Sequence, residues 1–400
     1  MMKTTIKEAN HPYIEDSDIR LRDICTKRAK ELYGETIPDE IAARINWELD
    51  AIYRTGTAYS FILHKELMEQ NNLTSEDVTF RGLSCGSYIL YLCGISNYNP
   101  LDFGLTPYFT FGLEKDKCID IEMNVPTSMQ EEIGRKVTDV ELAYNLSHRL
   151  NIHSSDIRLD DADILSLFNS TDTLGIIPDD IEGIKYGTLG LSDFKYKFTM
   201  NMLDDVKINS FDDVVKIQGL SHGTDTWFGN AQTLLEEGIL LSDIISTRED
   251  LYGYLVLKGI SEKDAYRITE AVRMGKGVNE ADEKLMHSND IPQWYIESCK
   301  KIHYLFPKAH SISYALNLWR LAYFKIHYPK EFYEEYFKVY NYGELNEAIS
   351  KGYDKFLAYE NKRKQEYDPM KEDEDYHDIY MREEHGILVA KEMYARGINL

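Results

Sequence analysis

Strand-like sequence is confined to the first third of this 400-residue chain, in two short runs at 107–113 and 118–125. Such runs, with their aromatic and β-branched residues, suit a pleated sheet. From residue 138 onward, helical patterns alternate with glycine-rich turns. Because a wound parallel sheet needs strands and helices in alternation, this order predicts an α+β fold, predominantly helical, with a single small sheet.

The length of the chain suggests two or three domains. We expect residues 1–140 to hold a helical N-terminal segment and the small sheet, and residues 141–343 to form a large helical domain. Residues 344–400 have a helical pattern and a dense acidic run at 366–386, which indicates a solvated surface or a linker.

Two helices of the first part have clear end signals. Residues 20–34 place Leu21, Cys25 and Ala29 on one face and stop at Gly34, a residue suited to a helix C-terminus. Residues 38–56 begin with proline and also stop at a glycine.

Composition excludes several classes of protein. The chain has 68 acidic and 45 basic residues, a net charge of −23, so a nucleic-acid site would have to be a local positive patch. It has no run of 18 apolar residues, so no membrane span is expected. Its five cysteines form no C-x-x-C pair, which argues against a zinc knuckle or a disulfide framework and for a cytoplasmic protein.

One segment runs against the acidic composition. Between Ser298 and Lys330 there is no acidic residue, while helical spacing there aligns an apolar stripe that includes Trp319. Lys308 and His310 open this helix, where free N–H groups would suit a phosphate, Tyr314 could stack on a base, and Arg320 and Lys325 could follow a nucleic-acid backbone. The alternative is a basic amphipathic helix whose charges are merely solvated.

Several motifs resemble one family. In chain order, the motifs "RGLSCGS", "DKCIDIEMN", "SHGTDTW" and "FPKAH" resemble, collinearly, the replicative DNA polymerase III alpha subunit of bacteria, the PolC type in particular. The resemblance extends from about residue 20 to about residue 398. It implies a partial palm with a small sheet, then a large helical fingers domain, acting on a DNA primer-template and dNTPs with Mg²⁺.

The resemblance also implies site residues. Alternation in a strand would point Asp120 and Glu122 to the same side, where they would be the catalytic, metal-binding pair. Nucleotide contacts are expected from Arg81, Gly82, Ser87, Arg248, Lys308, His310 and Tyr314. DNA contacts are expected from Lys300, Lys301, Arg320 and Lys325, and we expect Lys308, His310 and Arg320 to line a common groove.

Departures from the family's pattern point to reduced activity. Glu122 replaces an aspartate, Leu83 and Cys85 replace small residues of the phosphate turn, and the palm segment that bears the family's third aspartate is missing. Glu131, Glu132 or Asp139 could substitute for it. We therefore expect a PolC-like polymerase that is reduced or impaired when alone, completed by a second polymerase or replisome chain. The alternatives are an inactive DNA- or replisome-binding protein and a helical scaffold.

Overall fold

The computed structural model describes residues 16–129, 134–367 and 374–400. The chain divides into two compact units. Unit 1 comprises Met1–Ser75 and Phe80–Met123, and unit 2 comprises Glu76–Thr79 and Asn124–Leu400. Along the chain, the elements confirm a predominantly helical α+β fold with one small sheet.

Unit 1 is built from the helices α1 (Ser17–Tyr33), α2 (Asp39–Thr55), α3 (Ala58–Gln70), α4 (Tyr88–Leu92) and α5 (Tyr108–Phe111). Helices α1, α2 and α3 pack against one another or against α4 through their apolar faces. As predicted, α1 buries Leu21, Cys25 and Ala29 and ends at Gly34, and α2 ends at Gly56 in the left-handed conformation.

The prediction of a strand at 107–113 is wrong, because Tyr108–Phe111 forms one turn of helix. Pro107 sits just before the helix start and Gly112, with φ of 79°, ends it. Phe109 and Phe111 are buried, so the run is an apolar core segment. A short apolar run of this kind cannot be assigned to strand or helix from periodicity alone.

The second expected strand is present. The sheet has the order β1 (Thr79–Arg81), β2 (Glu122–Val125) and β3 (Arg135–Lys136), and β2 pairs with β3 in parallel through Asn124↔Arg135 and Val125↔Lys136. The segment that leads into β2 alternates as predicted: Ile119, Ile121 and Met123 are buried, whereas Asp120 and Glu122 are exposed.

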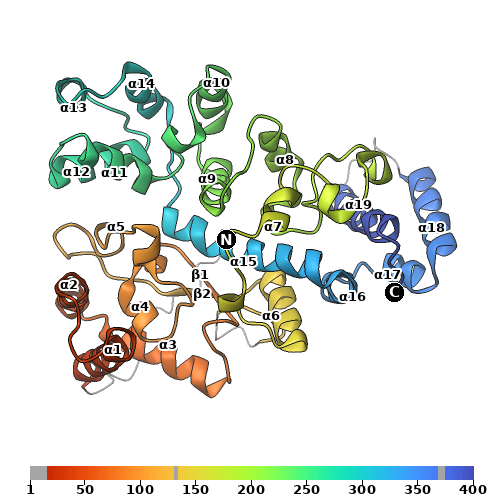
Figure 1. Cartoon of the computed structure of the whole chain (residues 1–400), viewed down its shortest axis with the longest axis horizontal. Coiled ribbons are helices and arrows are strands. Elements are labelled where there is room, and N and C mark those ends of the chain that lie inside the picture. The colour runs from red at the N-terminus through yellow and green to blue at the C-terminus, as the bar shows by residue number, and fades with distance from the viewer. Residues whose placement is uncertain (1–15, 130–133, 368–373) are drawn as a thin grey trace. The chain divides into compact units, whose positions relative to one another are not determined.

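Unit 2 contains the remaining helices, of which α15 is central. The helices of its first part are α6 (Thr138–Leu150), α7 (Ala162–Leu167), α8 (Lys197–Leu203), α9 (Phe211–His222), α10 (Gln232–Glu236), α11 (Arg248–Leu257), α12 (Glu262–Arg273), α13 (Glu280–Ser288) and α14 (Gln293–Lys301). Helix α15 (Lys308–His327) contacts α9, α6, α7 and α16 (Pro329–Tyr340), and it lies between α9 and α6 in Figure 1.

Helix α15 is buried almost all round rather than on one stripe. Ala315, Leu318 and Trp319 are buried as predicted, but so are residues on the other faces, among them Ser311 and Asn317. Its small residues let neighbouring helices approach closely. Because the helix is covered on every side, its polar side chains need hydrogen-bond partners within the protein.

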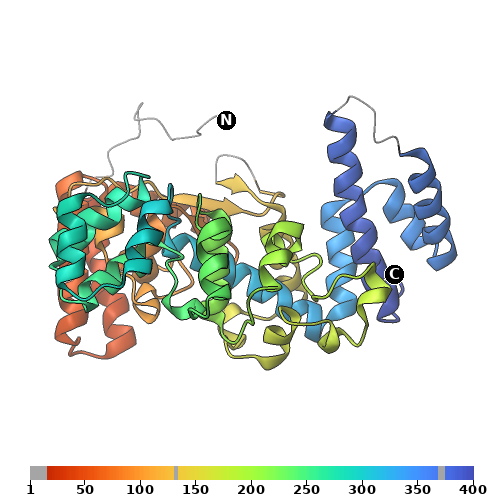
Figure 2. The ribbon, with the colours of Figure 1, turned by 90° about the horizontal axis from the view of Figure 1, so that it is seen from above.

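The chain ends in α17 (Glu344–Ser350), α18 (Tyr353–Glu366) and α19 (Glu374–Ala395), which gather at one end of unit 2 (Figures 1 and 2). Part of the expected acidic linker, residues 368–373, lies outside the described residues. Within the described part, no helix is both long and apolar enough to cross a membrane.

Candidate nucleotide and metal site

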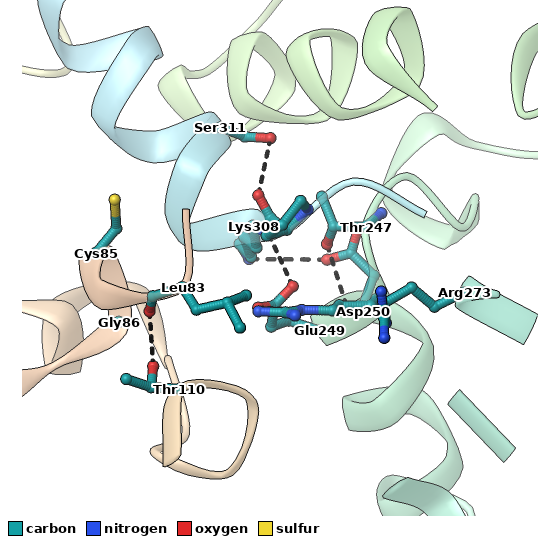
Figure 3. Close-up of polar contacts among 12 residues, drawn as sticks. Leu83, Cys85, Gly86, Thr110, Thr247, Glu249, Asp250, Arg273, Lys308 and Ser311 are labelled. Carbon is teal, nitrogen blue, oxygen red and sulfur yellow. Dashed lines mark hydrogen bonds and ion pairs between the residues drawn. The ribbon is translucent and has the colours of Figure 1, made fainter. Parts of the chain in front are cut away.

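Arg248 and Lys308, which are 60 positions apart, meet at the starts of two helices. Thr247 and Phe306 form a parallel bridge, in which the Arg248 amide donates to the Phe306 carbonyl oxygen at 3.3 Å. The backbone amide of Lys308 in turn donates to Glu249 Oε2 at 2.7 Å (Figure 3). The N-terminal ends of α11 and α15 are therefore joined by both backbone and carboxylate contacts.

Carboxylates pair with both cations. Arg248, which is buried, donates through Nε and Nη2 to Glu249 Oε1, each at 3.0 Å. Lys308 Nζ lies 3.5 Å from Asp212 Oδ1 and 3.8 Å from Asp250 Oδ1. Each cation thus already has a negative partner, so the cluster is close to electrically neutral.

Asp250 holds this cluster together. Its backbone amide donates to Thr247 Oγ1 at 3.3 Å, and its carboxylate accepts from the Thr247 amide at 3.2 Å, which caps the start of α11 (Figure 3). Lys216 Nζ lies 3.3 Å from the same carboxylate. Burial alone would raise the pKa of Asp250, but the charges of Lys216 and Lys308 outweigh it and hold the pKa below its usual value.

The pKa of Lys308 is also set by its neighbours' charges rather than by burial. Burial alone would lower its pKa, and the carboxylates of Asp250 and Asp212 more than offset this, so the pKa of Lys308 is raised. Gly219 of α9 makes the arrangement possible, because a Cβ there would come 2.8 Å from the Ser246 carbonyl oxygen, one residue before the Thr247 cap.

Aromatic rings line the opening turns of α15. Phe306 lies 4.7 Å, centroid to centroid, from His310, and His310 lies 4.7 Å from Tyr314. His222 of α9 stacks on Phe306 at 4.9 Å. The structure therefore brings together four of the expected finger residues, namely Arg248, Lys308, His310 and Tyr314.

In unit 1, the expected carboxylate pair lies on one side of the β2 segment. Asp120 and Glu122 are both exposed, and Glu122 Oε2 lies 3.1 Å from Arg81 Nε. Among the described residues, no group of three or more metal-ligating side chains is found. Glu131 and Glu132 lie outside those residues, and the Asp139 carboxylate accepts a hydrogen bond from Tyr340.

The turn that follows Arg81 is organised by a carboxylate that the sequence reasoning missed. Glu48 of α2 is fully buried and accepts from Ser87 Oγ at 2.9 Å and from the amides of Tyr88 and Ile89, each at 3.1 Å. Arg44 donates to Glu48 at 2.5 Å and to the carbonyl oxygens of Gly86 and Leu105. An acidic residue on the apolar face of α2, four positions after an arginine, was the available signal.

Ser87 is therefore a structural cap in this conformation, whereas Gly82 adopts a positive φ of 75°. The bulk of Leu83 does not fill the turn, because its side chain is 36% exposed. Its carbonyl oxygen accepts from Thr110 Oγ1 at 2.9 Å (Figure 3).

Two of the four expected DNA contacts need correction. Arg320 is buried and donates to the Glu76 carbonyl oxygen at 2.5 Å, about three turns along α15 from Lys308, so it does not share a groove with Lys308 and His310. Lys325 is fully buried, with Nζ 2.7 Å from Glu392 Oε1 and bonded to the carbonyl oxygens of Gly187 and Leu189. A buried cation with internal acceptors is not available to a DNA backbone.

Lys300 and Lys301 remain at the surface. Lys300 pairs with Glu283 at 2.8 Å and with Glu297 at 3.1 Å, and Lys301 donates to the Gly229 carbonyl oxygen at 2.7 Å. The basic residues of the segment 298–330 thus form neither one open basic face nor a set of simply solvated charges, because most of them have partners within unit 2.

Comparisons with known proteins point in one direction. Residues 19–150 match the model of the bacterial DNA polymerase III alpha NTPase domain, and residues 136–290 match that of the bacterial DNA polymerase III alpha subunit finger domain. The chain is similar to the "DNA polymerase III PolC-type" proteins of Oceanobacillus iheyensis (46% identity, 82% of this chain and 34% of that protein) and Thermotoga petrophila (28%, 83% and 36%). The protein of that name from Listeria welshimeri is 45% identical over half of this chain and 14% of its own length.

The chain spans about a third of the length of the relatives that it matches most extensively. The alignment with the Thermotoga petrophila protein extends over 487 residues, more than this whole chain holds, although it includes only 83% of the chain. That relative therefore has internal sequence without a counterpart here, in agreement with the expectation of a missing internal segment.

Proposed function

This chain belongs to the family of bacterial DNA polymerase III alpha subunits of the PolC type, and we propose that it takes part in template-dependent nucleotidyl transfer as a reduced palm and fingers. The observation that carries the proposal is the junction of Arg248 and Lys308 at the starts of α11 and α15, beside the His310 and Tyr314 rings. Cations next to a stacking surface suit the phosphates and the base of a dNTP.

In this proposal, Lys308 binds the phosphates and Tyr314 supports the base. Arg248 is buried and bonded to Glu249, so it acts as a positioning residue. Asp250 and Glu249 act as positioning residues, since they fix Lys308 Nζ and the Lys308 amide respectively. Within unit 1, we propose the Arg81 guanidinium as a phosphate-binding group in its own right; its Nε lies 3.1 Å from Glu122 Oε2.

The residues present fit a divalent metal only in part. Asp120 and Glu122 offer the oxygen donors that Mg²⁺ prefers, but Glu122 is paired with Arg81, and no third acidic group joins them within the described part of the chain. Mg²⁺ would supply stabilisation of the attacking and leaving oxygens. We propose that the chain is catalytically impaired when alone and that it acts in the cytoplasm once another chain completes the site.

Nucleotide binding and incorporation test the two parts of the proposal separately. A fluorescent dNTP analogue with Mg²⁺ should bind the full chain, and Lys308→Ala should weaken binding about tenfold, the loss of one charge-assisted contact. The control is Lys276→Ala, an exposed finger lysine for which no ion pair is found among the described residues. Equal affinity of the wild type and Lys308→Ala would refute the finger site.

Primer extension then reports on the carboxylates. Asp120→Asn should abolish incorporation, measured alone or with co-encoded replication proteins, while it leaves nucleotide binding within about twofold, because binding depends on the finger cations. Incorporation that persists in Asp120→Asn would exclude Asp120 from the chemistry.

A further inference from the structure

Unit 2 contains a large cavity, and neither Arg248 nor Lys308 is among the residues that line it. Its volume is about 1090 Å³. Its walls come from the segment 182–204, from Val339 to Tyr342 at the end of α16, and from one side of α19, including Met381 and His385. This is the size range of small-molecule and cofactor sites, which also combine apolar walls with a few polar groups.

One wall combines a lysine with aromatic rings. Lys195 Nζ lies 5.0 Å from the Tyr340 ring centroid and 5.5 Å from that of Tyr196, and it is 3.2 Å from the Tyr340 hydroxyl. Tyr196 is 57% exposed, so one face of its ring is open to a ligand. A cation beside an open aromatic ring is the arrangement with which proteins hold unpaired nucleotides, base on ring and phosphate on cation.

The cavity wall carries both carboxylates and cations. Glu182 pairs with Lys364 and Lys391, Asp204 pairs with Lys185, and Asp139 accepts from the Tyr340 hydroxyl, while Asp378 and Glu384 also line the wall. By contrast, no carboxylate lies within ion-pair distance of Lys195 or of the exposed Lys197 among the residues that the structure describes. Lys197 is therefore left for a ligand, whereas Lys195 is linked to the Asp139 carboxylate through the Tyr340 hydroxyl.

A polar side chain, His385, also lines the cavity. His385 Nε2 is buried without a hydrogen-bond partner among the described residues. Burial, with a contribution from the charge of Lys195, lowers the pKa of His385 to about 3, so the imidazole is neutral near pH 7. A neutral imidazole can donate to or accept from the edge of a base.

A second pair of rings continues from the cavity along α8. Phe198 follows Lys197 directly, and its ring lies 5.6 Å from that of Phe228, which is 68% exposed. One open tyrosine could serve a free nucleotide, but a row of open rings next to Lys197 suits successive bases of one strand.

We propose that this cavity is a second nucleic-acid site, which binds single-stranded DNA with one unpaired base against Tyr196 and the adjoining phosphates at Lys195 and Lys197. The choice of DNA over RNA rests on the proposed function, whereas the site itself does not require nucleotidyl transfer. A free mononucleotide could use the same ring and the same lysines, and the test below distinguishes it from a single strand.

The test measures the anisotropy of a labelled 12-nucleotide single strand with the full chain over a range of salt concentrations. Tyr196→Ala should weaken binding about tenfold, the effect of losing one stacked base. Lys197→Ala should lower the slope of log affinity against log salt by about 0.7, the value for one phosphate on a single strand. The matched controls are Tyr353→Ala, whose ring is 49% exposed on α18, and Lys355→Ala, and both should bind like the wild type.

The failure of this site can be told apart from failure of the finger site. Lys308→Ala should leave single-strand binding unchanged while it weakens nucleotide binding. Full competition by dTMP at a concentration equal to that of the strand would identify a free nucleotide as the ligand and would refute single-stranded DNA as the ligand. Absence of strand binding at low salt, or equal affinity of Tyr196→Ala and the wild type, would overturn the site altogether.

Discussion

The replacement Glu48→Gln isolates the carboxylate that organises the turn of unit 1. Glu48 is fully buried, and its two oxygens serve different donors. Oε1 accepts from Arg44 Nε and the Tyr88 amide, and Oε2 accepts from Ser87 Oγ and the Ile89 amide. Glutamine has almost the same shape but offers one oxygen and one NH₂ group.

The magnitude follows from this division. The remaining oxygen will stay with Arg44 and Tyr88, since a guanidinium cannot accept from an NH₂ group. The Ser87 hydroxyl can rotate and accept, but the Ile89 amide would then face a second donor. One buried amide without an acceptor costs about 1–3 kcal/mol. Glu48→Ala should cost more, about 3–5 kcal/mol, because it leaves Arg44 without its buried partner.

Residue-resolved hydrogen exchange measures this directly. In Glu48→Gln, the Ile89 amide should exchange roughly ten to a hundred times faster than in the wild type, while the Tyr88 amide changes much less. The control is Glu31→Gln, at a carboxylate that is 48% exposed on α1, which should change stability by less than about 0.5 kcal/mol. Equal acceleration of both amides, or of neither, would refute the assignment of donors to the two oxygens.

Three further changes have defined outcomes. The pKa of His385 is about 3 in the folded protein and about 6.5 in the unfolded chain, so its contribution to the free energy of unfolding is complete above pH 6.5 and is lost as the pH falls toward 3. In urea unfolding, His385→Gln should therefore lose less stability on acidification than the wild type, by at most about 1.4 kcal/mol per pH unit. Lys325→Ala should destabilise by about 3–5 kcal/mol because it strands the buried Glu392 carboxylate, whereas replacing both with Met and Leu should be far milder, and equal losses in thermal unfolding would contradict this. Gly219→Ala should destabilise by about 1–3 kcal/mol, since its Cβ meets a backbone oxygen, whereas the α11 control Gly253→Ala, with open space around it, should be neutral or stabilising by up to about 1 kcal/mol.

Local signals in the sequence identified much of the fold. Gly34 and Gly56 ended their helices as predicted, because a left-handed or otherwise unusual C-terminal residue is a local requirement that glycine meets. The alternation from Ile119 to Met123 also placed Asp120 and Glu122 correctly, since a half-buried strand has a period of two. The turn at 107–113 was missed because its aromatic residues suit a strand and a buried helical turn equally.

The candidate site was less accessible to sequence reasoning. A basic residue looks the same in the sequence whether it lies at a surface or in an interior, and the partner that decides this is distant: Glu392 for Lys325, and the Glu76 carbonyl oxygen for Arg320. The resemblance implied that Arg248 and Lys308 both contact the nucleotide. The carboxylates that fix them became visible only in three dimensions, even though the spacing of the Thr247–Asp250 cap can be recognised in the sequence.

The same carboxylates determine how strongly the finger cluster can attract a nucleotide. Lys308 is shared between Asp250, which is largely buried and also caps α11, and Asp212, which is 56% exposed and 3.5 Å from Nζ. Asp212 thus competes with a phosphate without supporting the fold as Asp250 does. Asp212→Asn should strengthen binding of a fluorescent dNTP about two- to fivefold, since an exposed ion pair is worth up to about 1 kcal/mol, and the gain should fade at high salt. Unchanged or weaker binding at low salt would show that Lys308 Nζ does not meet the phosphates, and it would refute the finger site.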